Sequence, residues 1–91
     1  MTELERQVID ADAAEYILSH PVFKRACDGI EAEIYEMLAE VNMHDAAGQK
    51  ELLRSLKNLR RVRQALQATM YNGVVAKDML KRSKLKEFIG L

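Results

Sequence analysis

The sequence predicts an all-α protein in which two long antiparallel helices are flanked by short helices at both ends. Apolar residues recur at spacings of three and four almost throughout, and one Pro and four Gly leave no room for a flexible linker. Charge is divided by position, because residues 1–44 carry three basic and ten acidic side chains while residues 45–91 carry eleven basic and four acidic. The halves sum to −7 and +7, which suggests that one folds back on the other. A chain of 91 residues fits one helical domain, residues 1–91.

The N-terminal segment predicts a helix over residues 4–18. Thr2-x-x-Glu5 and Asp12-x-x-Glu15 are two overlapping capping-box patterns, in which the first side chain caps the helix and the Glu reaches back to it. The sequence leaves open whether residues 4–18 form one helix or a loose start followed by a shorter helix from Ala13.

The first long helix is predicted over residues 21–41. Pro21 suits its first turn, where the missing N–H would have had no partner, and ends the preceding segment at Ser19 or His20. Spacings of 4, 3, 4, 3 and 4 form the a/d pattern of a heptad repeat, the strongest signal in the chain, carried by Phe23, Cys27, Ile30, Ile34, Met37 and Val41.

A tight connection over residues 42–45 leads into the second long helix, predicted over residues 46–71. The Asp45 carboxylate is suited to cap that helix, and so short a connection makes the two helices antiparallel neighbours. The apolar stripe of the second helix consists of Leu52, Leu56, Leu59, Leu66 and Met70, broadened by Leu53 and Val62. Arg63 falls on this stripe, where it either extends its aliphatic stem towards water or meets a carboxylate at an oligomer contact.

Asn72 and Gly73 are predicted to stop the second helix, because Gly after a helix adopts positive φ readily and Val74 would make the accompanying apolar contact. A last helix is then expected over residues 75–88. Its apolar side carries Ala76, Met79, Leu80 and Phe88, and its other side is strongly basic, with Lys77, Lys81, Arg82, Lys84 and Lys86.

The charges map onto the proposed helix pair. Acidic residues occupy the second half of the first long helix, and basic residues occupy the first half of its partner, so we expect Glu31, Glu33, Glu36 and Glu40 to lie beside Lys50, Arg54 and Lys57. Each exposed pair contributes only about 0.2 to 1 kcal/mol, so apolar burial decides whether the pair folds. The sequence leaves open whether this charge pairing is specified or reflects two solvated faces.

No pattern in the sequence points to catalysis or to a bound cofactor or metal. Cys27 lies on the heptad stripe, as a buried structural thiol would, and is too solitary for an internal disulfide. His20 and His44 flank the first long helix about 35 Å apart at ~1.5 Å per residue, so they cannot share a metal within one chain. Phosphate loops, zinc spacings and Ser/His/Asp patterns are missing. We expect a non-enzyme with no small-molecule substrate.

Nucleic-acid binding is the main alternative function. Basic side chains of the second long helix, followed by the basic last helix, are able to line a phosphate-binding surface. Against this stand a net charge of zero and a sequence pI near 6.7. Tyr71 alone does not make a stacking platform for bases.

The run from Ala14 to Ala26, which contains Leu18, Pro21 and Phe23, carries the pattern A-x-x-L-x-x-P-x-F-x-x-A. With residues 45–56 and 59–63 downstream, it resembles the small helical-hairpin proteins encoded among the structural and packaging genes of tailed bacteriophages and prophages. The resemblance covers about residues 11–73. It implies two amphipathic helices and a phage context, and it carries no functional residues over. Small packaging-terminase subunits also build rings from helical hairpins, but their N-terminal helix-turn-helix is not evident here.

The sequence therefore predicts an oligomeric assembly or adaptor protein, with a nucleic-acid-associated packaging or regulatory protein as the alternative. The expected partners are further copies of the chain and another protein, with no membrane, since no apolar run approaches the ~18 residues of a span. We expect it in the cytoplasm of an infected or lysogenic host cell, or in the virion. The predicted association stripe comprises Phe23, Ile30, Ile34, Met37, Val41, Leu52, Leu56, Leu59, Leu66 and Met70. The predicted contacts to phosphate or to an acidic partner are Arg54, Lys57, Arg60, Arg61, Arg63, Lys81, Arg82 and Lys84.

Overall fold

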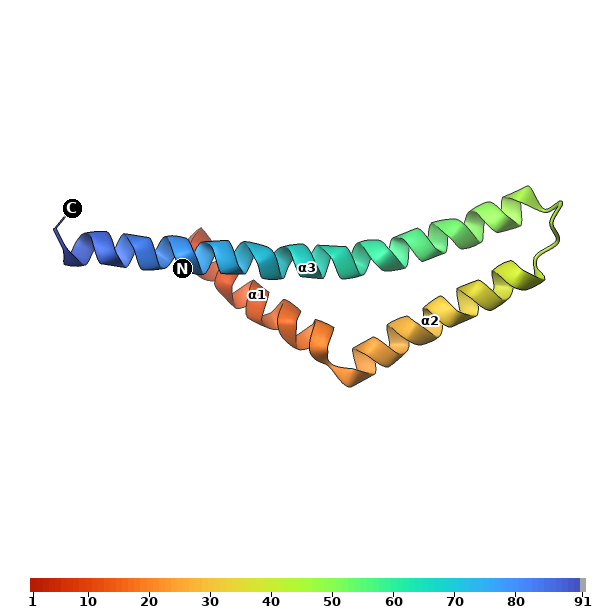
Figure 1. Ribbon diagram of the computed structural model, residues 1–91, viewed down its shortest axis with the longest axis horizontal. Helices are drawn as coiled ribbons and strands as arrows, with labels where there is room; N and C mark the ends of the chain where they lie inside the picture. Colours follow the sequence, from red (N-terminus) through yellow and green to blue (C-terminus); the bar gives the residue numbers. More distant parts are fainter. Residues whose placement is uncertain (91) are drawn as a thin grey trace. The chain divides into compact units, whose positions relative to one another are not determined.

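The computed structural model describes residues 1–90, which form three α-helices and no β-strand (Figure 1). Helix α1 spans Glu3–Ser19, α2 spans Pro21–Glu40 and α3 spans Ala46–Phe88. The all-α prediction is confirmed. The chain divides into two compact units, of which unit 1 combines Met1–Leu18 with the chain from Ala65 onward, and unit 2 is Ser19–Gln64. Helix α3 contributes to both units.

Helix α1 begins with the first of the two predicted capping boxes. The Thr2 hydroxyl accepts a hydrogen bond from the Glu5 backbone N–H at 3.2 Å, and the Glu5 carboxylate accepts one from the Thr2 backbone N–H at 3.3 Å. These bonds satisfy backbone donors that the first turn leaves unpaired. One helix then continues to Ser19, so the alternative of a shorter helix from Ala13 is wrong.

Helix α2 begins and ends close to its predicted bounds. His20 is the N-cap, because its Nδ1 accepts from the Val22 N–H at 3.1 Å, and Pro21 occupies the first turn as predicted. The helix ends at Glu40, and the Val41 N–H is bonded to the Met37 carbonyl at 2.9 Å.

The connection into α3 is the predicted tight turn. The His44 N–H donates to Asn42 Oδ1 at 2.8 Å, which fixes the turn. Asp45 caps α3 as predicted, since its Oδ1 accepts from the Gly48 N–H at 2.9 Å.

The predicted helix break at Asn72 and Gly73 is wrong, because α3 runs unbroken from Ala46 to Phe88. Gly73 is buried inside the helix and does not adopt positive φ, and Val74 is exposed instead of making a capping contact. A Gly in a helix interior costs about 1 kcal/mol relative to Ala. The structure explains why this cost is tolerated: a Cβ at Gly73 would overlap the Ala11 methyl group.

Unit 1 is held together by small side chains where α1 meets the second half of α3. Ala11 and Ala14 of α1 and Gly73 and Ala76 of α3 are buried. Because none carries more than a methyl group, the two helix backbones approach closely here. An ion pair between Lys77 and the Asp12 carboxylate, 3.8 Å apart, lies beside this contact.

Unit 2 is formed by α2 and the first half of α3. Its buried side chains are Cys27 and Ile34 of α2 and Leu56 of α3, with Leu38 half-buried on the same face of α2. Leu53 and Val62 do not broaden the apolar stripe as predicted, because both are exposed. The covered stripe of α3 is therefore narrower than predicted.

No helix in the described part of the chain is long and apolar enough to cross a membrane.

Candidate interaction surfaces

A charged cluster joins the two helices of unit 2 around Arg63. Its guanidinium donates to Asp28 Oδ1 at 3.0 Å and lies 3.5 Å from Glu31 Oε2. Both carboxylates belong to α2, at positions separated by one helical turn, so one guanidinium spans them. Arg63 thus meets carboxylates of its own chain, whereas the two alternatives that the sequence left open were an extended stem and a carboxylate at an oligomer contact.

The buried thiol of Cys27 lies beside this cluster. The neighbouring Cys27 thiol and the Asp28 carboxylate raise the pKa of the Arg63 guanidinium above its usual value. Arg63 therefore stays charged at neutral pH. The Cys27 thiol is buried, as its heptad position predicted.

Tyr35 and Arg60 extend the cluster along the same two helices. The Tyr35 hydroxyl donates to Glu31 Oε1 at 3.3 Å, and the Arg60 guanidinium donates to the Tyr35 oxygen at 3.2 Å. The contacts Asp28 with Arg63 and Tyr35 with Arg60 run in opposite order along α2 and α3. The cluster therefore connects the two helices at positions about two turns apart on α2 and nearly one turn apart on α3.

Replacing Arg63 with Met should lower the thermal stability of the protein and reduce the dependence of that stability on salt. The substitution leaves Asp28 and Glu31 without their cationic partner and keeps most of the aliphatic stem. The matched control is Arg54→Met, which removes only the ion pair with Glu51 of the same helix, at 3.2 Å. Thermal denaturation at two salt concentrations should show a larger loss for Arg63→Met; equal effects would contradict a linking role for Arg63.

The predicted association stripe is divided by the structure into covered and uncovered residues. The buried or half-buried members are Phe23, Ile34, Val41, Leu52, Leu56, Leu59, Leu66 and Met70. Ile30 and Met37 are uncovered, with exposed fractions of 48% and 53%. Within a single chain these two residues therefore do not belong to the covered face of α2. Leu38, which is not part of the heptad pattern, is half-buried and does belong to that face.

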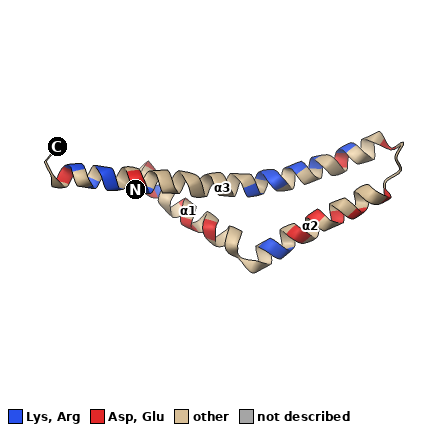
Figure 2. Ribbon diagram, viewed as in Figure 1, with Lys and Arg blue, Asp and Glu red and all other residues tan. Residues whose placement is uncertain are grey.

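The predicted basic contacts are distributed over two parts of α3 (Figure 2). In unit 2, Arg54 pairs with Glu51, Arg60 donates to Tyr35, and Arg63 pairs with Asp28 and Glu31. Lys57 and Arg61 are exposed and make no ion pair within residues 1–90. Within residues 1–90, Lys50, Arg54 and Lys57 make no ion pair with the acidic stretch of α2. Arg54 pairs with Glu51 of its own helix, and Arg63 is the residue that pairs with Glu31 of that stretch. In unit 1, Lys81, Arg82 and Lys84 are exposed near the end of α3, and Arg82 pairs with Asp78 at 3.1 Å.

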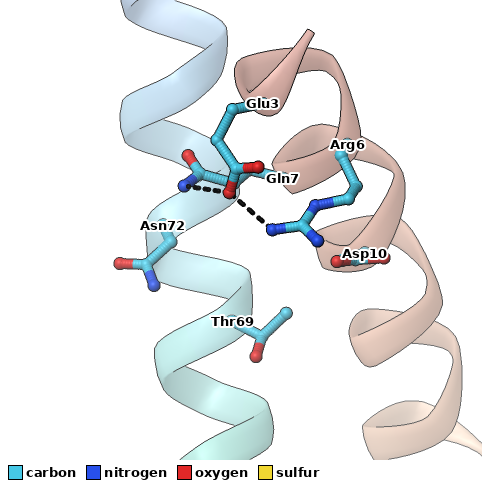
Figure 3. A pocket seen from close by; sticks show the side chains of 6 residues that line it. All are labelled: Glu3, Arg6, Gln7, Asp10, Thr69 and Asn72. Carbon is cyan, nitrogen blue, oxygen red and sulfur yellow. Dashed lines mark hydrogen bonds and ion pairs between the residues drawn. The ribbon is translucent and has the colours of Figure 1, made fainter. Parts of the chain in front are cut away.

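A polar hollow of about 260 Å³ lies between α1 and α3 in unit 1, lined by Glu3, Arg6, Gln7, Asp10, Thr69 and Asn72. Figure 3 shows the Glu3 carboxylate between the side chains of Arg6 and Gln7, which donate to it at 2.6 and 3.4 Å. The bond to Glu3 raises the pKa of Arg6. The Thr69 hydroxyl donates to the Ala65 carbonyl of its own helix at 2.9 Å. The polar groups of the hollow thus bond mainly to one another or to their own helix.

Residues 1–90 bring together no group of three His, Cys, Asp or Glu side chains able to hold a metal ion. His20 caps α2, and His44 lies in the turn after that helix.

The close approach at Gly73 is the contact that sequence reasoning missed. Its signal is present in the sequence as two pairs of small residues at a spacing of three, Ala11 with Ala14 and Gly73 with Ala76. Such pairs lie on one face of a helix and permit another helix to come near. Taken without this spacing, the Asn72-Gly73 pair predicts a helix stop, which the continuous helix α3 contradicts.

Comparison with models of known protein families, with characterised proteins and with solved structures finds no match for this chain.

Proposed function

We propose that this protein is a non-enzymatic assembly or adaptor protein that works as a homo-oligomer. In this proposal α2 and the first half of α3 form an antiparallel hairpin, and its uncovered apolar residues are the surface on which copies associate. The phage-like pattern of residues 14–26 supports a role in virion structure or morphogenesis, within an infected or lysogenic host cell or in the virion.

The imbalance between buried and exposed apolar side chains carries this proposal. Among residues 1–90, six apolar side chains are buried, and only Ile34 and Leu56 of these are large. Eighteen large apolar side chains are exposed. Single exposed apolar residues are ordinary, but small domains with thin cores commonly gain stability through oligomerisation.

One row of apolar residues on α2 is the best-defined part of this surface. Phe23, Ile30 and Met37 follow one another at intervals of seven residues and therefore share one face of the helix. Phe23 is half-buried, and Ile30 and Met37 are about half exposed. We call these three residues the outer row of α2. A second copy of the chain is the expected occupant, because the −7 and +7 halves of one chain complement those of another.

Nucleic-acid association remains the alternative function, and the bonds of three guanidinium groups argue against it. Arg54, Arg60 and Arg63 each bond to a side chain of unit 2, so using them for phosphate would break those bonds. Light scattering across a concentration series tests the proposed function. An assembly protein should have at least the mass of a dimer at micromolar concentration, whereas a monomer at every concentration would contradict the proposal.

The variant Ile30→Ser with Met37→Ser should weaken self-association by about tenfold or more, since each large apolar side chain contributes about 1.5 to 3 kcal/mol when fully covered. The control is Met43→Ser, which removes an even more exposed Met from the turn between α2 and α3. Sedimentation velocity measures both variants against the wild type. Equal weakening by the control, or unchanged association of the double variant, would exclude the outer row as the contact.

A further inference from the structure

The last turns of α3 form an uncovered basic and apolar surface. Every residue from Lys81 to Gly90 is exposed, and Phe88, with an exposed fraction of 88%, is among the most exposed apolar residues of the protein. Residues 81–90 carry four basic side chains and one acidic one. We call residues 81–90 the basic end.

The basic end has its apolar and cationic groups on one face. Leu85 and Phe88 are three residues apart, and Lys81 and Arg82 precede Leu85 by four and three residues, so all four side chains lie on neighbouring positions of the helix surface. In the described residues Lys81 makes no ion pair, and Arg82 is paired only with Asp78 of its own helix. A partner surface for this face must therefore be acidic with apolar residues beside the charges.

Helix α2 presents a surface with this chemistry. Glu33 and Glu40 each follow a residue of the outer row by three positions, and Glu36 is three residues from Glu33 and four from Glu40, so the three carboxylates form a row along one side of Ile30 and Met37. All three carboxylate residues are exposed and, within residues 1–90, make no ion pair. We call Glu33, Glu36 and Glu40 the acidic flank.

We propose that the basic end of one copy docks on the acidic flank and outer row of α2 of a second copy. Leu85 and Phe88 then cover Ile30 and Met37, while the cationic side chains meet the three carboxylates. The contact joins two different surfaces, so each copy offers one of each and the assembly continues until it closes as a ring or grows as a filament. This inference rests on the proposed self-association and specifies which surfaces carry it.

Two charge-reversed proteins test the contact. The first carries Lys81→Glu, Arg82→Glu, Lys84→Glu and Lys86→Glu, and the second carries Glu33→Lys, Glu36→Lys and Glu40→Lys. Each alone juxtaposes like charges, so we expect the apparent dissociation constant of self-association to rise about tenfold or more at low salt. Mixed in equal amounts, the two proteins have complementary surfaces again, and the mixture should recover the wild-type size in sedimentation velocity.

Charge reversal elsewhere provides the control. Lys50→Glu with Lys57→Glu reverses exposed cations of α3 outside the basic end and should leave the association unchanged. Circular dichroism of each variant checks that its helix content is that of the wild type. If both charge-reversed proteins self-associate as tightly as the wild type, the docking contact is wrong and the proposed function still stands. A wild type that stays monomeric would overturn both.

Two further outcomes identify a different occupant of the basic end. A mixture that stays dissociated although each variant is helical shows that the two surfaces do not meet and overturns the inference. Tight binding of random duplex DNA by the wild type, steeply weakened by salt and lost only in the protein with the reversed basic end, would assign that end to phosphate. We expect the wild type to bind such DNA feebly at ~150 mM salt.

Discussion

Ile34→Ala should destabilise unit 2 by about 2 to 5 kcal/mol, the range measured for truncation of large apolar side chains in packed cores. Ile34 has an exposed fraction of 6%, and no neighbouring large side chain of α2 is buried as fully. Leu56→Ala should have an effect of the same size, since Leu56 is 7% exposed on α3. A small domain is stable by only about 5 to 15 kcal/mol, so either loss is a large fraction of the total.

The matched control is Ile30→Ala, which makes the same chemical change on the same helix at an exposed position. Both substitutions alter helix propensity equally, so the difference between them isolates burial. Urea denaturation should be followed by circular dichroism at a concentration at which the protein is monomeric. Comparable losses in Ile34→Ala and Ile30→Ala would mean that the covered face of α2 has been misassigned.

Gly73→Ala should destabilise the protein, although alanine favours helix. The new methyl group would overlap that of Ala11 and lie 3.2 Å from the Gln7 carbonyl oxygen, so α1 and α3 must separate locally. Overpacking of this kind costs about 1 to 3 kcal/mol. We expect lower stability in urea and faster hydrogen exchange of the α1 backbone amides around Ala11.

Gly29→Ala is the control for this prediction. Gly29 is also helical, but a Cβ there meets nothing within 4 Å. This substitution should therefore stabilise the protein by about 0.5 to 1 kcal/mol, the usual gain from replacing Gly with Ala in a helix. Adding Ala11→Gly to Gly73→Ala should recover part of the loss, because it removes the methyl group that the new side chain meets. Stabilisation by Gly73→Ala alone would contradict the close approach.

Local signals in the sequence were sufficient to predict most helix boundaries. Thr2 and Asp45 specify the starts of two helices through bonds to residues three positions on, and Pro21 specifies the start of α2 through its fixed φ; the structure contains all three starts. Such bonds depend on residues two or three positions apart, which a single sequence displays directly. The all-α class followed from the same short-range periodicity.

Contacts between distant residues were predicted less well. The need for glycine at position 73 comes from its contact with Ala11, 62 positions away. The residues next to Gly73 in the sequence predict a turn instead. The heptad pattern predicts that Ile30 and Met37 belong to the covered stripe, but both are exposed. A spacing of seven shows that residues share one face of a helix and does not show which edge of that face is covered. Arg63 was placed correctly on the apolar stripe, but its carboxylate partners, Asp28 and Glu31, became evident only from the structure.

Helix α3 gives the two units different chain topologies, and this difference bears on the order in which they fold. Unit 2 is one continuous stretch, Ser19–Gln64, whose two helical segments are joined by a short turn. Unit 1 combines the beginning of the chain with its final third, so its contact between Ala11 and Gly73 closes a loop of about sixty residues. Closing so long a loop costs more entropy than closing a turn. When unit 2 folds first, the loop that the contact between Ala11 and Gly73 must close becomes shorter. We expect α1 to dock last, on an α3 already formed, and to detach first when the protein unfolds.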